Sequence, residues 1–257
     1  MTKDEWKWGD EPAEILLLHG FSGGPSDLRY LGDRLHGAGF ACLAPALPGH
    51  GPDAERLGEV EARDWQEAAG ERLRSFASAR GGPVFVVGYS LGGALASYLA
   101  ATQPENVRAL VLLAPAFGLT GSSDLYRKLF RLPLASRLVP RVKKGPPDLA
   151  PGSLPIDRGP SLLPTRAARF LDRMIRDARE VVHQVRCPAR VYWGAADRVV
   201  PRWAAEEAAR RLGAPLEVLP NSTHHLALGP DRERLAQGTL AFFRSAVEAA
   251  PALAEVR

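Results

Sequence analysis

Short apolar runs alternate with amphipathic helical segments along most of the chain, and this alternation constrains the fold more than any other feature. Strand-like runs occupy residues 15–19, 41–47, 84–88, 107–114, 190–194 and 216–219. Helical spacing of apolar residues occupies residues 26–36, 63–79, 91–102, 165–182, 203–212 and 231–248. Strands that alternate with helices pack as a parallel sheet covered by helices. The sequence therefore predicts an α/β fold with a mostly parallel central sheet flanked by helices.

Residues 117–186 interrupt the alternation, because they contain no strand-like run. Their middle is dense in proline, with eight prolines from Pro133 to Pro164, and a helix is clear only at residues 165–182. A structureless connection of this length is unusual inside a compact domain. We therefore predict an inserted helical cap (lid) at residues 117–186, with residues 1–116 and 187–257 forming the core.

The candidate nucleophile is Ser90, which lies between the buried strand at 84–88 and the helix at 91–102. The turn between them reads Gly88-Tyr-Ser-Leu-Gly92, the pattern of a nucleophile elbow. Glycine is required on both sides because side chains there would collide with the neighbouring strand and helix. The same turn aims the Leu91 backbone N–H at the place where an oxyanion would form.

A serine nucleophile needs a base and a carboxylate that orients the base, each placed after a later strand. Asp197 follows the strand at 190–194, so it stands where the acid is expected. The strand at 216–219 is followed by two adjacent histidines, His224 and His225, and the position of the base is open between them. These residues predict a Ser-His-Asp triad.

The loop after the strand at 15–19 is the candidate source of a second oxyanion donor, the backbone N–H of Phe21. His19 and His50 are expected to hold loops rather than to catalyse. Ser22 is expected to be a polar turn residue, with a supporting role at the oxyanion site as the alternative.

These motifs together resemble the α/β-hydrolase superfamily, and within it the bacterial carboxylesterases and monoacylglycerol lipases. The similarity runs from residue 15 to residue 243 and includes Leu18-His-Gly-Phe-Ser-Gly, Leu47-Pro-Gly-His-Gly, Ala196-Asp-Arg-Val-Val-Pro and Asn221-Ser-Thr-His. It implies a helical cap inserted after the strand at 107–114, and it favours His224 as the base because an apolar residue usually follows the histidine. His225 departs from that pattern. The segment before Ile15 leaves little room for the antiparallel strands that are usual in the family.

The resemblance implies a serine carboxylic-ester hydrolase that forms an acyl-enzyme with a small-molecule ester and uses no metal or organic cofactor. Alternatives on the same fold are a thioesterase, a C–C bond hydrolase and a perhydrolase. A small-ligand receptor without catalysis is a further alternative, which an intact triad argues against.

The charge is unevenly distributed, and this bears on possible partners. The chain has 33 Lys and Arg against 29 Asp and Glu, yet residues 117–186 hold 14 basic and 6 acidic residues. The predicted cap therefore carries a balance of +8 and the remainder −4. The basic residues are not interleaved with aromatic ones as a nucleic-acid platform requires, so no nucleic acid is expected. The basic cap suggests anionic substrates or transient contact with an anionic lipid surface, with a solvated arginine-rich exterior as the alternative.

Membrane and targeting signals are not recognised in the sequence. Its longest apolar runs fall far short of the roughly 20 residues that a bilayer-spanning helix needs. The first residues lack the apolar segment of a secretory signal, so a cytoplasmic location is expected. Within the predicted cap, apolar side chains are expected either to line an acyl site or to pack the cap onto the core: Leu125, Leu129, Phe130, Leu134 and Leu138.

Overall fold

The computed structural model describes residues 5–10, 12–157 and 159–248. Its main sheet has seven strands in the order β1-β3-β2-β4-β5-β8-β9, and every pair is parallel except β1 with β3. The strands are β1 (Glu5–Trp8), β2 (Ile15–Leu18), β3 (Cys42–Pro45), β4 (Val84–Tyr89), β5 (Val107–Leu113), β8 (Ala189–Gly194) and β9 (Leu216–Leu219). The predicted α/β class with a mostly parallel central sheet is confirmed.

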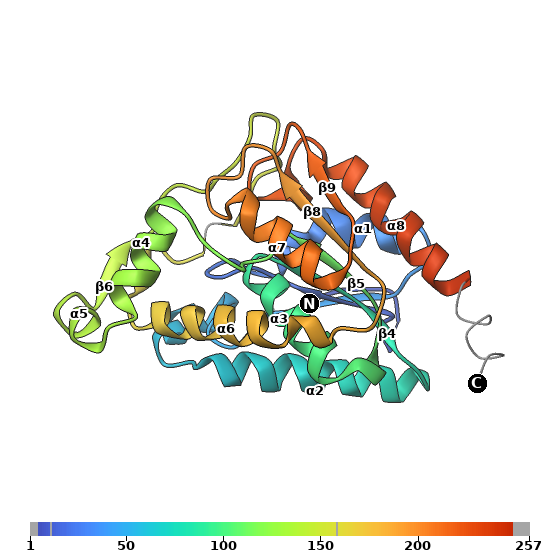
Figure 1. Ribbon diagram of the computed structural model, residues 1–257, viewed down its shortest axis with the longest axis horizontal. Coiled ribbons are helices and arrows are strands. Elements are labelled where there is room, and N and C mark those ends of the chain that lie inside the picture. Colours follow the sequence, from blue (N-terminus) through green and yellow to red (C-terminus); the bar gives the residue numbers. More distant parts are fainter. Residues whose placement is uncertain (1–4, 11, 158, 249–257) are drawn as a thin grey trace.

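Helices cover both faces of this sheet (Figure 1). On one face α1 (Arg29–Gly37) packs against α8 (Arg232–Glu248). On the other face α3 (Leu91–Thr102) packs against α2 (Ala62–Arg80) and α6 (Ala167–Val181), while α7 (Arg202–Leu212) packs on β8. Each of these helices was expected from apolar spacing. Short 3-10 helices complete the connections, at Pro25–Leu28, Gly51–Gly58, Pro104–Asn106, Val182–Gln184 and Leu226–Leu228.

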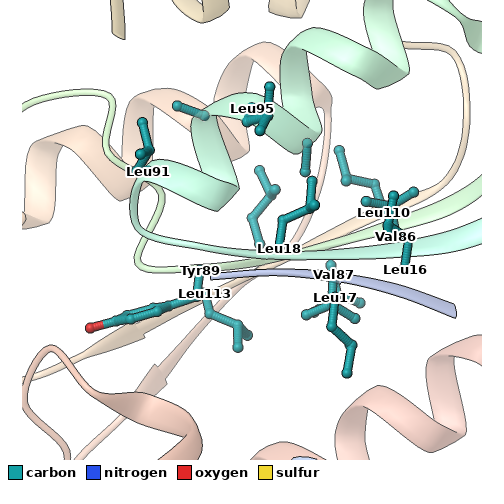
Figure 2. Close-up of a cluster of buried hydrophobic side chains, with 14 of the residues drawn as sticks. Leu16, Leu17, Leu18, Val86, Val87, Tyr89, Leu91, Leu95, Leu110 and Leu113 are labelled. Carbon is teal, nitrogen blue, oxygen red and sulfur yellow. The ribbon is translucent and has the colours of Figure 1, made fainter. Parts of the chain in front are cut away.

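The central strands are buried on both faces, because side chains that alternate along them meet a helix layer on either side (Figure 2). Leu16, Leu18 and Val86 point toward Leu91 and Leu95 of α3. The alternate residues point to the opposite face: Leu17, Val87, Tyr89 and Leu113. Burial on both faces holds the carboxyl ends of the strands in a rigid edge, on which the candidate site is built.

The structure corrects the expectation that little room exists for an antiparallel strand before Ile15. β1 needs only four residues to pair with the full length of β3. Trp8 anchors the strand, since its indole Nε1–H donates to Asp33 of α1 at 2.7 Å. The lack of a side chain at Gly32 leaves space for the indole ring, whose atoms would lie 2.4 Å from a Cβ there.

The insertion, residues 117–186, leaves the main sheet after β5 and returns to it at β8. It contains α4 (Gly121–Phe130) and α5 (Pro133–Leu138) besides α6. It also contains a two-stranded antiparallel sheet, β6 (Arg141–Lys143) with β7 (Leu162–Pro164), so the expectation of no strands there is wrong. Three-residue strands, one of them ending in proline, are too short to produce a readable alternation. That the insertion acts as a separate cap stays a prediction, because α6 packs along α3 as a flanking helix does.

Most of the apolar insertion side chains singled out from the sequence do not pack the insertion onto the core. Leu125, Leu129, Leu134 and Leu138 are exposed, by 47% to 74%. Only Phe130 is buried, with its ring beside that of Tyr126. The packing expectation is therefore wrong for the four leucines, because the short helices α4 and α5 turn these side chains toward solvent. These helices lie with β6 at one end of the molecule (Figure 1).

Candidate active site

Ser90 occupies the sharp turn between β4 and α3. Its backbone has φ 53° and ψ −114°, a left-handed conformation that is strained for a residue with a side chain. The two glycines of the turn allow the close approach that this geometry needs. A Cβ at Gly88 would lie 2.2 Å from the carbonyl oxygen of Gly92, and one at Gly92 would lie 2.1 Å from that of Leu18. The expected steric role of these glycines is confirmed.

The structure brings Ser90, His224 and Asp197 into one hydrogen-bonded chain. The Ser90 Oγ lies 3.0 Å from His224 Nε2, and His224 Nδ1 lies 2.9 Å from Asp197 Oδ2. Since a carboxylate only accepts hydrogen bonds, the proton of the neutral ring belongs on Nδ1. Nε2 is then free to accept the serine proton. This is the arrangement in which an imidazole can act as a general base.

Asp197 is held from its other side by the backbone that follows it. Its Oδ1 accepts hydrogen bonds from the N–H groups of Val199 at 2.8 Å and Val200 at 2.9 Å. The side chain of Asp197 is fully buried, so both oxygens depend on these partners instead of water. The loop after β8 therefore fixes which carboxylate oxygen faces His224.

His225 lies beside the site, and its ring contacts Tyr89, whereas the Ser90 hydroxyl contacts His224. The His225 Nδ1 lies 3.0 Å from the Tyr89 hydroxyl. Burial lowers the pKa of His225 to about 3 and raises that of Tyr89 well above 10, so the tyrosine hydroxyl donates to a neutral ring. Of the two adjacent histidines, the structure therefore brings His224 to the serine.

The loop that follows β2 lies against the serine and carries Phe21. The loop approaches the serine so closely that a Cβ at Gly20 would lie 3.3 Å from the Ser90 Cβ. His19 holds the loop, as expected: its Nε2 accepts from Leu47 N–H at 3.0 Å, and its Nδ1–H donates to the Gly20 carbonyl at 2.9 Å. Burial lowers the pKa of His19 to about 4, so the ring is neutral.

His50 lies in a second loop beside the first. Its Nδ1 lies 3.1 Å from the Pro48 carbonyl oxygen, and its ring packs edge-on against His19 and Phe21. Burial lowers the pKa of His50 to about 3. Both histidines are therefore neutral supports of their loops.

The far end of the Phe21 loop is held by two titratable groups. Asp27 Oδ2 accepts from the Gly24 N–H at 3.4 Å, and Lys144 of the insertion donates to the Ser22 carbonyl at 2.7 Å. Burial raises the pKa of Asp27 to about 7, against the lowering effects of the Gly24 hydrogen bond and of the Lys144 charge. Ser22 itself has a left-handed backbone, with φ 56°, which is consistent with a turn residue.

Sequence reasoning missed one residue near Asp197 and His224, Asp148 of the insertion. Its side chain accepts hydrogen bonds from the backbone N–H groups of Arg198, at 2.9 Å, and His224, at 3.2 Å. Asp148 lies in a stretch without helix or strand and far along the chain from both partners, so no local pattern could have identified it.

Two features of the described residues bear on other kinds of site. No group of three or more His, Cys, Asp or Glu side chains there is arranged to hold a metal ion. Within the same part of the chain, no helix combines the length and apolar character needed to cross a membrane.

Known proteins are similar to this chain in sequence. Residues 15–237 match the model of the alpha/beta hydrolase family. A thermostable monoacylglycerol lipase of Bacillus sp. (strain H-257) is 29% identical over 242 residues, which cover 90% of each chain. A carboxylesterase of Bacillus subtilis (strain 168) is 35% identical over 99 residues, covering 38% of this chain and 39% of the relative.

Solved structures share the fold over nearly the whole chain. A structure from work on the metagenome-derived lipolytic enzymes LipS and LipT superposes with a TM-score of 0.84 at 24% identity, covering 95% of this chain and 98% of the other. A monoacylglycerol lipase of Paleococcus ferrophilus superposes with a TM-score of 0.75 at 18% identity, covering 96% and 100%. Both have the fold described above.

Proposed function

The chain belongs to the alpha/beta hydrolase family, and we propose that it is a serine carboxylic-ester hydrolase with Ser90 as nucleophile, His224 as base and Asp197 as orienting acid. The observation that supports this most is the continuous pair of hydrogen bonds, 3.0 Å and 2.9 Å, at the carboxyl edge of the sheet. Relatives named as a lipase and a carboxylesterase support an ester as the substrate class. Monoacylglycerol-lipase or carboxylesterase activity is the form that we propose.

In the proposed first half-reaction, Ser90 Oγ attacks the ester carbonyl carbon while its proton passes to His224 Nε2. The Nδ1–H of His224 stays hydrogen-bonded to Asp197, which stabilises the imidazolium as it forms. The backbone N–H groups of Phe21 and Leu91 are proposed to stabilise the oxyanion of the tetrahedral intermediate. When that intermediate collapses, the C–O bond breaks, the imidazolium gives its proton to the alcohol, and an acyl-enzyme remains.

In the second half-reaction a water molecule attacks the acyl carbon of the Ser90 ester. His224 accepts a proton from the water and then returns it to Ser90 Oγ as the carboxylic acid leaves. The protein ends the cycle in its starting protonation state, and these steps use only the ester, water and the protein's own groups.

The test is hydrolysis of p-nitrophenyl esters of increasing acyl length, with Ser90→Ala as the matched variant and labelling by a serine-directed phosphonate. We expect the wild type to hydrolyse at least one ester and the phosphonate to modify Ser90. Ser90→Ala should fold normally, hydrolyse none and remain unlabelled. A Ser90→Ala protein with wild-type activity, or no turnover of any ester by the wild type, would overturn the proposal.

We also propose that the insertion makes transient contact with an anionic lipid surface. Seven of the nine large hydrophobic side chains exposed in the described chain lie between residues 125 and 162. Exposed cations lie on or directly beside the same short helices and strands: Arg131, Arg137, Arg141 and Lys143. Apolar side chains interspersed with basic ones suit an interface where acyl chains meet anionic headgroups.

The lipid proposal is tested by co-sedimentation with vesicles of phosphatidylcholine, with and without phosphatidylglycerol. We expect stronger binding to the anionic vesicles, weakened by salt and by the double substitution Leu134→Ser with Leu138→Ser. Val247→Ser removes an exposed apolar side chain outside the insertion and should leave binding unchanged. Equal sedimentation with both vesicles, insensitive to the leucine substitutions, would refute the proposed contact.

A further inference from the structure

The proposed acid and base stand on two different loops, and their hydrogen bond depends on the spacing between those loops. Asp197 follows β8 and His224 follows β9, and neither residue belongs to a helix or strand. The Nδ1 to Oδ2 distance of 2.9 Å is thus set by irregular backbone on both sides. The loops are joined directly by a backbone hydrogen bond, from the Ala196 N–H to the Ser222 carbonyl at 3.1 Å, and contacts from the insertion add to it.

Asp148 contacts both loops, at Arg198 in the acid loop and at His224 in the base loop. Its Oδ2 accepts from Arg198 N–H, which directly follows the acid, and from His224 N–H, which belongs to the base itself. Its Oδ1 accepts from Arg198 Nε at 2.7 Å. Its backbone carbonyl also accepts from the Thr223 hydroxyl at 2.7 Å, one residue before the base. One residue of the insertion therefore bridges the acid loop and the base loop.

The environment of Asp148 suits an ionised carboxylate. Burial alone would raise its pKa, but hydrogen bonds from Arg198 and His224, together with the Arg198 charge, hold the pKa below its usual value. The Asp148 side chain is buried, whereas that of Arg198 is largely exposed. Hydrogen bonds to an ionised acceptor are stronger than those to a neutral one, so the bridge resists separation of the loops.

We propose that Asp148 is a positioning residue, which acts on the reaction by holding the loops of Asp197 and His224 at the spacing of the triad. The inference rests on the proposed function, because it assigns a role relative to that triad. It also gives the insertion a part in the chemistry, since the Asp148 carboxylate, which adds to the backbone contact between the two loops, comes from the insertion.

Asp148→Ala removes the acceptor from both backbone N–H groups while leaving Ser90, His224 and Asp197 in place. Small displacements of a catalytic group cost up to about 100-fold in rate, so we expect kcat to fall about 10- to 100-fold. KM should change far less, because Asp148 acts on the triad and not on the substrate. Asp148→Asn keeps an oxygen that can accept from both N–H groups, so it should recover much of the lost kcat.

Two control variants separate positioning from general stability. Asp172→Ala also removes a buried aspartate of the insertion, but its arginine partners, Arg127 and Arg176, belong to the insertion. We expect Asp172→Ala to lower the unfolding temperature and to keep the wild-type kcat at a temperature where it is folded. Arg198→Ala removes only the guanidinium contact to Asp148 and should reduce kcat less than Asp148→Ala does.

The measurement is kcat and KM for one p-nitrophenyl ester, together with the low-field proton NMR signal of His224 Nδ1–H. We expect Asp148→Ala to broaden or shift that signal, and Asp172→Ala to leave it unchanged. A folded Asp148→Ala variant with wild-type kcat and an unchanged signal would overturn the inference. A Ser90→Ala variant with wild-type activity would instead overturn the proposed function, so the two failures are distinguishable.

Discussion

Asp197→Asn is the substitution whose outcome the geometry predicts most completely. Asparagine has the size of aspartate but carries one acceptor oxygen and one donor NH₂. The N–H groups of Val199 and Val200 both point at Oδ1, so the amide oxygen must take that position. The NH₂ group then faces His224 Nδ1 and donates to it. The proton of the neutral ring moves to Nε2, which faces Ser90. This nitrogen then cannot accept the serine proton.

The magnitude follows from the loss of the productive tautomer. The corresponding substitution in a serine protease lowers kcat by about 10⁴-fold. At 1.36 kcal/mol for each factor of ten, this equals about 5.4 kcal/mol of transition-state stabilisation. The unfolding free energy should change much less, since the two backbone hydrogen bonds to the side-chain oxygen remain.

The assay is kcat for a p-nitrophenyl ester, measured beside thermal unfolding of the same preparation. Asp172→Asn provides an isosteric control at a buried aspartate of the insertion, for which no loss of kcat is expected. A folded Asp197→Asn variant that retains kcat within about tenfold of wild type would show that the tautomer argument, and the role of Asp197, are wrong.

Three further predictions concern the surroundings of the triad. Gly92→Ala places a Cβ 2.1 Å from the Leu18 carbonyl oxygen, and urea unfolding should show a loss of about 3 kcal/mol or more; an unchanged midpoint contradicts this. His224→Ala should lower kcat by about 10⁴-fold or more, and His225→Ala by far less; the reverse order would move the base by one residue. Because the folded state keeps a proton on Asp27 up to about pH 7 that the unfolded state releases near its ordinary pKa, stability should fall as pH rises between these values. Asp27→Asn removes this pH dependence, so the amount by which its free energy of unfolding exceeds that of the wild type should grow with pH, to at most about 4 kcal/mol by about pH 8. Urea unfolding that shows a difference independent of pH would contradict this.

The core of the fold could be predicted because its signals are local. Helix α3 begins and ends at the predicted residues, 91 and 102, because a glycine turn precedes it and its small side chains are continuous. The expected positions of Ser90, Asp197 and the two histidines follow from the rule that catalytic residues come after strands. Where strands are long and buried on both faces, their composition alone identifies them.

Interactions between distant segments could not be predicted in the same way. β1 was not expected, although its four residues, Glu-Trp-Lys-Trp, alternate charged and aromatic side chains; so short a run is identified as a strand only by its pairing with β3. The choice between His224 and His225 depends on which ring faces Ser90. A sequence pattern cannot separate the two, because both are histidines at adjacent positions. In the structure the His224 ring contacts Ser90 and the His225 ring contacts the Tyr89 hydroxyl.

The insertion shows the limit of sequence reasoning most clearly. Proline breaks the periodicity of its backbone, so the direction of each side chain is set by tertiary contacts and not by spacing. Asp148, buried in the proline-rich stretch, is a consequence of this. The four exposed leucines instead lie on the short helices α4 and α5, which turn them toward solvent. Because the same segment also bears the excess positive charge, sequence changes in the insertion are expected to affect the proposed lipid contact and the proposed positioning of Asp197 and His224 together. Changes confined to α1 or α8 should affect stability more than activity, because these helices pack on each other across the sheet from α3.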